Sequence, residues 1–272
     1  MAVLKSNPQG RWFLRLLLSG LLGLAFFFSI ETTWSADDKV RFVTLEFAPF
    51  IYGKNQQVAG PGRDLIEAVC DEAGIDCSFD IYPWRRAQEL MKKGEADGMM
   101  VIGRNPKREE WIRFSPPHFR TEYGIFVESK DILDFINIAQ LEGLRIGVFA
   151  PSNTAVQLED IRDEMIAQGL DPIEIEERPD DASGFRKLAA GRIDAVYSNR
   201  DRGRQILEIE GLTDKVRYAG GHQGILYYAG FTRSFPNQEL VDRFDAAWLE
   251  LFRRGEAQKI IKSYGLEPAD VE

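Results

Sequence analysis

The chain has 272 residues, of which 44% are hydrophobic, and its formal net charge at pH 7 is −9. This length allows one large or two medium-sized domains with apolar cores, and the acidic balance argues against nucleic acid as a partner. Two cysteines and two distant histidines are too few to predict a metal site, so we expect no metal and no cofactor.

The first 35 residues have the pattern of a secretory signal peptide. Lys5, Arg11 and Arg15 precede an uncharged run over 16–30, and cleavage is expected on one side or the other of Ala36. An uncleaved membrane anchor is the weaker alternative, because this run spans only about 22 Å of a roughly 30 Å hydrocarbon core. Removing three cations and one anion takes the net charge from −9 to near −11. We therefore expect the mature chain to be periplasmic.

Strands and helices alternate in the first part of the mature chain. Hydrophobic periodicity predicts a strand over Val40–Leu45, a turn-rich segment over Pro49–Gly62, a helix with Leu65, Ala68, Val69 and Ala73 on its apolar face, a strand over Cys77–Tyr82, a helix over Arg86–Lys93 and a strand over Gly98–Ile102. This order predicts a βαβαβ unit with a mainly parallel sheet.

A second series of the same kind follows. Its predicted elements are a strand over Arg145–Phe149, a helix over Asn153–Gln168, a strand over Ile173–Glu176, a helix over Phe185–Ala190 and a strand over Ile193–Ser198. Two similar α/β units are the simplest interpretation.

The C-terminal part predicts one strand and two helices. These are a strand over Leu226–Thr232, a long helix over Gln238–Arg254 with Leu240, Phe244, Trp248 and Leu251 facing inward, and a last helix over Glu256–Tyr264. The segment Gly220–Gly230 is rich in glycine and aromatic residues, which suits a return connection between two lobes. Both histidines, His118 and His222, are expected in loops.

The two cysteines lie at the junction of a predicted helix and a predicted strand. In an oxidising compartment, Cys70 and Cys77 are expected to form a disulfide. Closing this short loop would contribute about 2.5 kcal/mol by the chain-entropy estimate, which is structural reinforcement.

The order and spacing of several short motifs resemble one family over nearly the whole mature chain: the extracellular solute-binding proteins of family 3, the polar-amino-acid receptors of ATP-driven importers. The motifs are Phe47-Ala48-Pro49-Phe50, Gly60 with Asp64-Leu65, Gly94 with Ala96-Asp97-Gly98, Arg108 with Phe114-Ser115-Pro116, Leu144 to Val148, and Ala190 to Ala195. Residues 83–87, Pro-Trp-Arg-Arg-Ala, are similar to a Pro-Trp-x-Arg-Ala motif of one branch. The cysteine pair is similar to the disulfide of the histidine-binding member.

The resemblance implies an α/β fold of the two-lobed, type II periplasmic binding protein class, with two hinge crossings. Lobe 1 would comprise 36–120 and 228–272, and lobe 2 would comprise 121–227. The implied function is a monomeric receptor that closes over a small polar or carboxylate-bearing solute, an amino acid or a derivative, and delivers it to a membrane ABC permease. It implies no enzymatic activity and no catalytic residues.

Arg108 matches the family arginine that holds the ligand carboxylate. A guanidinium offers a fixed fork of donors that can hold a carboxylate by two parallel hydrogen bonds. From the residues alone, a solvated arginine among charged neighbours is the alternative. Arg104 is a second candidate, because the segment between Asp97 and Arg108 is one residue shorter than in well-known members.

The remaining candidates lie at three further places. Phe47 and Trp84 match positions that wall the ligand by apolar or cation–π contact, whereas Phe50 is assigned to the core. Glu46 is a candidate for contact with a basic ligand group, or else a solvated carboxylate. Ser152, Asn153 and Thr154 open a helix, where free backbone N–H groups bind carboxylates; ordinary N-capping is the alternative.

Two departures from the family pattern bear on the ligand. Asn199 stands where the family has the aspartate that holds the ligand ammonium, and this loss could cost about 2 kcal/mol against a zwitterion. Val101-Ile102-Gly103 stands where the family has a strand end rich in serine and threonine. Either Asp181 or Glu46 is a candidate to compensate.

Two other functions remain as alternatives. One is an enzyme on the same scaffold, resembling cyclohexadienyl dehydratase, with Glu46 in acid–base work. The other is a ligand-sensing partner of a separate membrane signalling protein.

Overall fold

The computed structural model describes residues 38–270, so the predicted signal peptide, 1–35, lies outside the described residues. The first half comprises β1 (Lys39–Thr44), β2 (Tyr52–Lys54), β3 (Gln57–Ala59), α1 (Pro61–Ala73), β4 (Asp76–Ile81), α2 (Trp84–Lys92), β5 (Gly98–Gly103), α3 (Pro106–Glu109) and β6 (Ile112–Glu128). These bounds confirm the predicted βαβαβ unit to within two residues at each strand or helix end.

The second half follows the predicted order, with one additional helix, α6. It comprises a 3-10 turn η1 (Ile138–Leu141), β7 (Arg145–Phe149), α4 (Asn153–Gln168), β8 (Glu174–Arg178), α5 (Asp181–Leu188), β9 (Ala195–Asn199), α6 (Arg200–Ile209), β10 (Val216–Thr232), α7 (Gln238–Arg253), α8 (Glu256–Ser263) and β11 (Glu267–Pro268). Within residues 38–270, none of the helices has the length and apolar character needed to cross a lipid bilayer.

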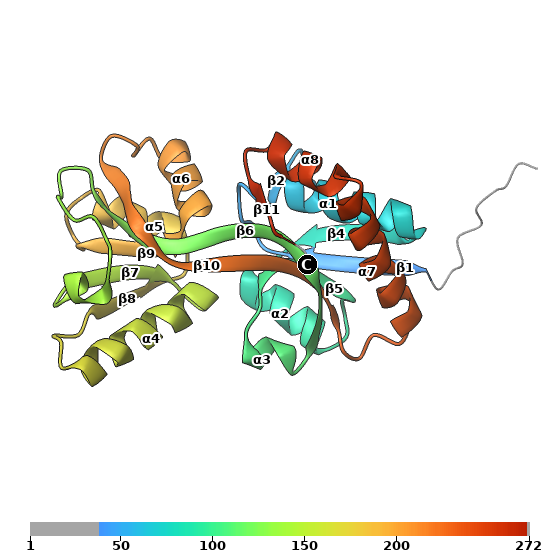
Figure 1. Ribbon diagram of the computed structural model, residues 1–272, viewed down its shortest axis with the longest axis horizontal. Helices are drawn as coiled ribbons and strands as arrows, with labels where there is room; N and C mark the ends of the chain where they lie inside the picture. The colour runs from blue at the N-terminus through green and yellow to red at the C-terminus, as the bar shows by residue number, and fades with distance from the viewer. Residues whose placement is uncertain (1–37, 271–272) are drawn as a thin grey trace, which may run out of the picture. The chain divides into compact units, whose positions relative to one another are not determined.

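Two sets of parallel strands are joined by two long antiparallel strands (Figure 1). One set has the order β4-β1-β5 and the other β9-β7-β8, and β10 and β6 run side by side between them. Helices α1, α7 and α8 cover one face of the first set and α2 and α3 the other, whereas α4 lies opposite α5 and α6 on the second set. This arrangement confirms the two-lobed α/β fold with two crossings.

The crossing strands are longer than the sequence suggests. The 17-residue strand β6 was not predicted, because it contains Pro116 and Pro117, and β10 begins ten residues before the predicted strand over Leu226–Thr232. Gly124 of β6 permits close packing of the two strands, because a Cβ there would lie 2.3 Å from the carbonyl oxygen of Gly220 in β10. The two crossing strands pair with each other along their length, so the hydrophobic pattern of either segment alone does not identify it as a strand.

We infer that the lobes divide near 120–121 and 227–228. From Tyr123 onward β6 pairs with β9, and from Tyr227 onward β10 pairs with β5. At this level of the sheet β6 therefore gains β9 of the second lobe as a neighbour, and β10 gains β5 of the first.

The predicted core residues are buried. Helix α7 places Leu240, Phe244, Trp248 and Leu251 in the interior, as its periodicity predicts, and Phe50 is fully buried. Cys70 at the end of α1 and Cys77 in β4 form the predicted disulfide.

The prediction that both histidines lie in loops is wrong. His118 lies in β6 and is 2% exposed, and His222 lies half-buried in β10. The ring of His118 packs 4.4 Å from the ring of Trp248, and its Nε2 lies 3.1 Å from the Ser115 hydroxyl. Burial lowers the pKa of His118 to about 3.

The burial of neutral His118 predicts that stability falls in acid. The unfolded chain binds a proton near pH 6.5, whereas the folded chain binds it only near pH 3, so the free energy of unfolding decreases as pH falls through this window. At pH 5 the loss should be about 2 kcal/mol. Urea unfolding of the wild type and His118→Gln at pH 7 and pH 5 measures it, and an equal loss in both proteins would contradict the assignment.

Candidate functional site

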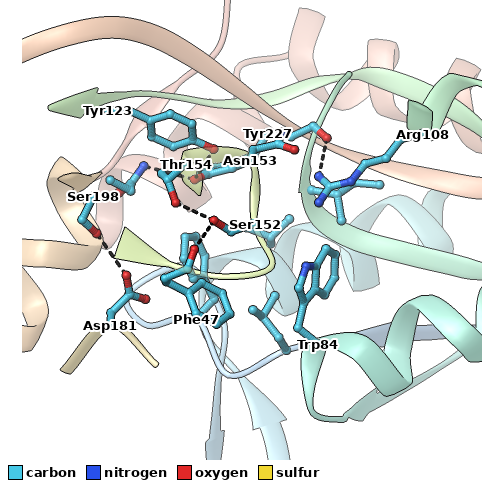
Figure 2. Close-up of a pocket in the computed structure, with 16 residues that line it drawn as sticks. Phe47, Trp84, Arg108, Tyr123, Ser152, Asn153, Thr154, Asp181, Ser198 and Tyr227 are labelled. Atoms are coloured by element: carbon cyan, nitrogen blue, oxygen red, sulfur yellow. Dashed lines mark hydrogen bonds between the residues drawn. The ribbon is translucent and has the colours of Figure 1, made fainter. Parts of the chain in front are cut away.

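A small cavity lies where the two lobes meet (Figure 2). Its volume is about 60 Å³, enough for a few water molecules. One side comes from the first lobe and the crossing strand β10: Leu45, Phe47, Trp84, Val101, Ile102, Gly103, Arg108 and Tyr227. The other side comes from the second lobe and β6: Tyr123, Phe149, Ser152, Asn153, Thr154, Asp181, Ser198 and Asn199.

Arg108 brings a buried positive charge to this cavity. Its residue is 8% exposed, and its Nη1 donates to the carbonyl oxygen of Gly103 at 2.7 Å. The guanidinium carbon lies 5.1 Å from the centre of the Trp84 ring. Burial lowers the pKa of Arg108, which the nearby Tyr123 and Tyr227 partly oppose.

Among residues 38–270, no carboxylate forms an ion pair with Arg108. A buried cation is unfavourable unless an anion and hydrogen-bond acceptors compensate it. Asn105 precedes the short helix α3 and fixes the position of Arg108, because the Asn105 side chain accepts a hydrogen bond from the Arg108 backbone N–H at 2.8 Å. The site is therefore complementary to a carboxylate.

The predicted aromatic wall lies in the cavity and is wider than predicted. Phe47 and Trp84 line it, together with Phe149, Tyr123 and Tyr227. The two tyrosines were missed because they lie on the crossing strands, which the sequence pattern does not reveal. A prediction of residues 112–128 as a strand would have identified Tyr123 as a candidate site residue.

Helix α4 presents the predicted polar group at its first turn. Ser152 caps the helix, since its hydroxyl accepts from the backbone N–H of Ala155 at 3.0 Å, and it lies 2.6 Å from the Thr154 hydroxyl. Asn153 accepts a hydrogen bond from Asn105 of the other lobe at 2.7 Å. All three residues line the cavity, and Asn153 also joins the two lobes by this hydrogen bond.

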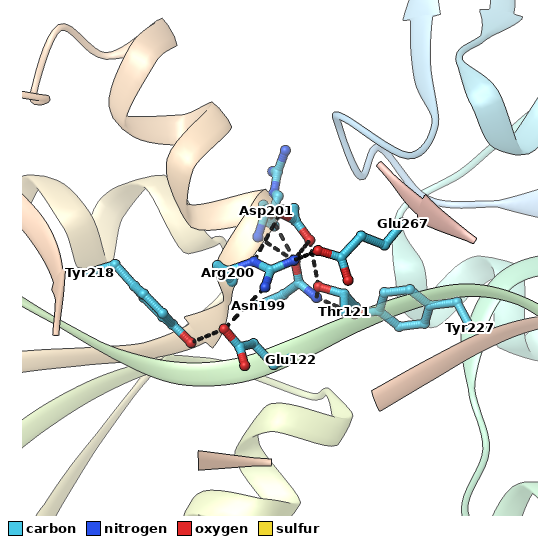
Figure 3. A network of polar contacts seen from close by, with 9 residues as sticks. Thr121, Glu122, Asn199, Arg200, Asp201, Tyr218, Tyr227 and Glu267 are labelled. Atoms are coloured by element: carbon cyan, nitrogen blue, oxygen red, sulfur yellow. Dashed lines mark hydrogen bonds and ion pairs between the residues drawn. The ribbon is translucent and has the colours of Figure 1, made fainter. Parts of the chain in front are cut away.

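Asn199 lies in the cavity lining, but its amide is fully engaged by the protein. Its oxygen accepts from the backbone N–H groups of Asp201 and Arg202, at 3.0 and 2.9 Å, and so caps α6. Its nitrogen donates to the hydroxyls of Thr121 and Tyr227, at 3.1 and 3.2 Å. Figure 3 shows this network. All four hydrogen-bonding positions of the amide are thus used.

Asp181 is the one acidic residue among the described residues that line the cavity. It accepts from the Ser198 hydroxyl at 3.2 Å, and its Oδ2 lies 3.4 Å from Nε of Arg202. Burial raises the pKa of Asp181, and Arg202 opposes that rise. Arg202 was not predicted as a site residue.

The structure does not bring Glu46 and Arg104 to the cavity. Glu46 is exposed and accepts from the backbone N–H of Gly53 at 2.8 Å, which turns it toward the β2–β3 hairpin. Arg104 is exposed, pairs with Glu109 and lies over the Phe114 ring. Of the two predicted arginines, only Arg108 therefore lies in the cavity lining.

The strand end over 101–103 has an unusual backbone. Val101 has φ of +57°, a conformation that costs a β-branched residue about 1–3 kcal/mol. Gly103 permits the lobes to approach, because a Cβ there would lie 2.4 Å from Nδ2 of Asn153.

Nowhere in residues 38–270 do three or more histidine, cysteine or acidic side chains gather as a metal site would require.

The engaged amide of Asn199 predicts that Asn199→Ala is strongly destabilising. The change removes the cap of α6, worth about 1 kcal/mol, and takes away the donor from which the buried Thr121 and Tyr227 hydroxyls accept, which costs about 1–3 kcal/mol. We expect the free energy of unfolding in urea to fall by about 2–4 kcal/mol. Asn199→Asp keeps the cap and should lose less, so equal losses would contradict this account.

Two proteins of known function are similar in sequence to this chain. The arginine-binding protein 1 of an ABC transporter of Escherichia coli (strain K12) is 24% identical over 168 residues, which are 61% of this chain and 65%, just under two thirds, of that protein. The arginine-binding periplasmic protein of Mannheimia haemolytica is 24% identical over 246 residues, covering 87% of this chain and 94% of that protein.

Solved structures share the fold. The arginine-, lysine-, histidine-binding protein ArtJ of Geobacillus stearothermophilus superposes with a TM-score of 0.69 at 24% identity, covering 85% of this chain and 96% of that one. A histidine kinase sensor domain with similarity to periplasmic binding proteins superposes with a TM-score of 0.73 at 20% identity, covering 85% and 98%. The sequence profile of one family matches residues 40–267, which is most of the chain. The protein therefore belongs to the bacterial extracellular solute-binding proteins, family 3.

Proposed function

We propose that this protein is a periplasmic receptor that captures a small carboxylate-bearing solute, an amino acid or a derivative, between its lobes and delivers it to an ABC permease. The observation that carries the proposal is the buried guanidinium of Arg108. It lines the cavity between the lobes and has no carboxylate partner among residues 38–270. A ligand carboxylate supplies the missing charge and acceptors.

The division of the cavity between two lobes supports capture by closure. Arg108 and Trp84 come from one lobe, and the first turn of α4 comes from the other. A solute held by both sets of groups favours the closed arrangement over an open one. The hydrogen bond from Asn105 to Asn153 is one contact that closure forms.

Three observations support export and partnership with a permease. The N-terminal segment has the signal-peptide pattern, and the Cys70–Cys77 disulfide suits an oxidising compartment. The relatives of similar length are named as periplasmic or as components of ABC transporters. We infer that the receptor acts as a monomer toward its permease.

Removal of the guanidinium should abolish solute binding. Mass spectrometry of small molecules that copurify with the mature protein identifies a ligand, and calorimetry then measures its affinity. We expect Arg108→Ala to weaken binding by 100-fold or more, because a buried charged contact of this kind contributes about 3 kcal/mol. Arg104→Ala, which removes an exposed arginine outside the cavity, is the matched control. Unchanged affinity in the Arg108 variant would refute the assignment.

We further propose that the protein performs no chemistry on its ligand. Glu46, the residue that an acid–base mechanism would require, is exposed and lies outside the cavity lining. Incubation of the mature protein with prephenate or arogenate should therefore give no product above the rate without protein. Chromatography measures the product. Catalytic product formation in that assay would establish the dehydratase alternative instead.

A further inference from the structure

We infer that the cavity selects a small monocarboxylate that carries no ammonium or guanidinium group, and that Arg202 sets this selectivity. The inference rests on the proposed function, in which Arg108 holds the ligand carboxylate. It narrows the proposed ligand from an amino acid or a derivative to a derivative that lacks the amine. The evidence is that the groups able to receive a ligand cation already have partners within the protein.

The first such group is the Asp181 carboxylate. Among the described residues that line the cavity, Asp181 is the only acid. Its Oδ2 lies 3.4 Å from Nε of Arg202, and both side chains are largely buried, at 10% and 16% exposed. A ligand ammonium at Asp181 would place a second cation beside the Arg202 guanidinium, which repels it at short range.

The second such group is the amide of Asn199. Its oxygen already accepts two backbone hydrogen bonds, and its nitrogen is a donor that an ammonium cannot use. At this position the amide therefore serves the protein, capping α6 and joining it to Thr121 and Tyr227. A ligand ammonium gains no acceptor here.

The third group is the pair of aromatic faces. The guanidinium carbon of Arg202 lies 5.7 Å from the centre of the Phe47 ring, and that of Arg108 lies 5.1 Å from the centre of the Trp84 ring. Phe47 also stacks on Phe50, with ring centres 5.5 Å apart. Protein arginines thus already make the cation–π contacts that these rings offer.

The charge balance of the cavity leads to the same ligand class. Arg202 neutralises Asp181, so Arg108 leaves one positive charge uncompensated. A monocarboxylate neutralises it, whereas a zwitterion brings a cation for which no free carboxylate lines the described cavity. Aromatic and aliphatic side chains surround the rest of the ligand, so an apolar or aromatic body is favoured.

Arg202 also ties ligand selection to closure of the lobes. Its Nη1 donates to the carbonyl oxygen of Ala48 at 3.2 Å, across the cleft from α6. The same side chain that pairs with Asp181 in one lobe therefore contacts Phe47 and Ala48 of the other. In the closed protein these contacts hold Arg202 in place beside the Asp181 carboxylate.

Matched pairs of acids test the inference. Calorimetry compares 3-phenylpropionate with L-phenylalanine, pentanoate with L-norvaline, and propionate with L-alanine on the mature wild-type protein. In each pair that binds, we expect the acid without the amine to bind at least tenfold more tightly. Equal or tighter binding of the amino acids overturns the inference. Because Arg108→Ala should abolish binding of both classes, amino-acid binding that needs Arg108 still leaves the proposed function intact.

Two variants separate the role of Arg202 from mere exclusion by shape. Arg202→Gln frees Asp181, and Asn199→Asp adds a carboxylate while keeping the cap of α6. Each should reduce the preference for the amine-free acid at least tenfold, whereas the exposed control Arg104→Gln should leave it unchanged. If Arg202→Gln fails to fold, Arg202→Met, which also removes the charge, replaces it. A wild-type preference in the folded Arg202 variant refutes the role of Arg202, a wild-type preference in Asn199→Asp refutes the claim that the lack of a free carboxylate excludes an amine, and failure of every acid and amino acid to bind refutes the proposed function.

Discussion

The site depends on one buried cation, the Arg108 guanidinium, which has no acidic partner among residues 38–270. Arg108 is fixed by the Gly103 carbonyl group, the ring of Trp84 and the capped turn that begins after Asn105. A protein tolerates such a charge only where something else compensates it. Because Arg108 lies at the junction of two lobes, an anion that compensates it there would also contact the other lobe, and its binding would favour closure.

The two crossing strands make this arrangement possible. β6 and β10 carry Tyr123 and Tyr227 into the cavity and pass from one lobe to the other as paired strands. Because these two strands are the sheet connections between the lobes, each lobe keeps its own parallel strands and its own helices. Gly103 and Asn153 then meet at the cleft, where a Cβ at position 103 would displace the terminal amide of Asn153.

The second arginine of the cleft gives the family scaffold a different charge balance. Arg202 pairs with Asp181 and covers Phe47, so the groups suited to a ligand cation are already paired within the chain. Asn199 caps α6 without offering a charge. Under the proposed function, the fold and the carboxylate anchor are retained while internal ion pairs alter the preference for the remainder of the ligand.

Local periodicity and short motifs are enough to predict the parallel βαβ units, the buried face of α7 and Arg108 as one of two candidate arginines, and the export signal leads to the disulfide. The folded chain alone reveals that Arg108 and not Arg104 lines the cavity, that β6 and β10 are long strands, and that Arg202 lies beside Asp181. These features depend on partners distant in the sequence, as Asn199 and Thr121 are, which lie 78 positions apart and form a hydrogen bond. Such contacts form only when the chain returns on itself, and no local pattern records them.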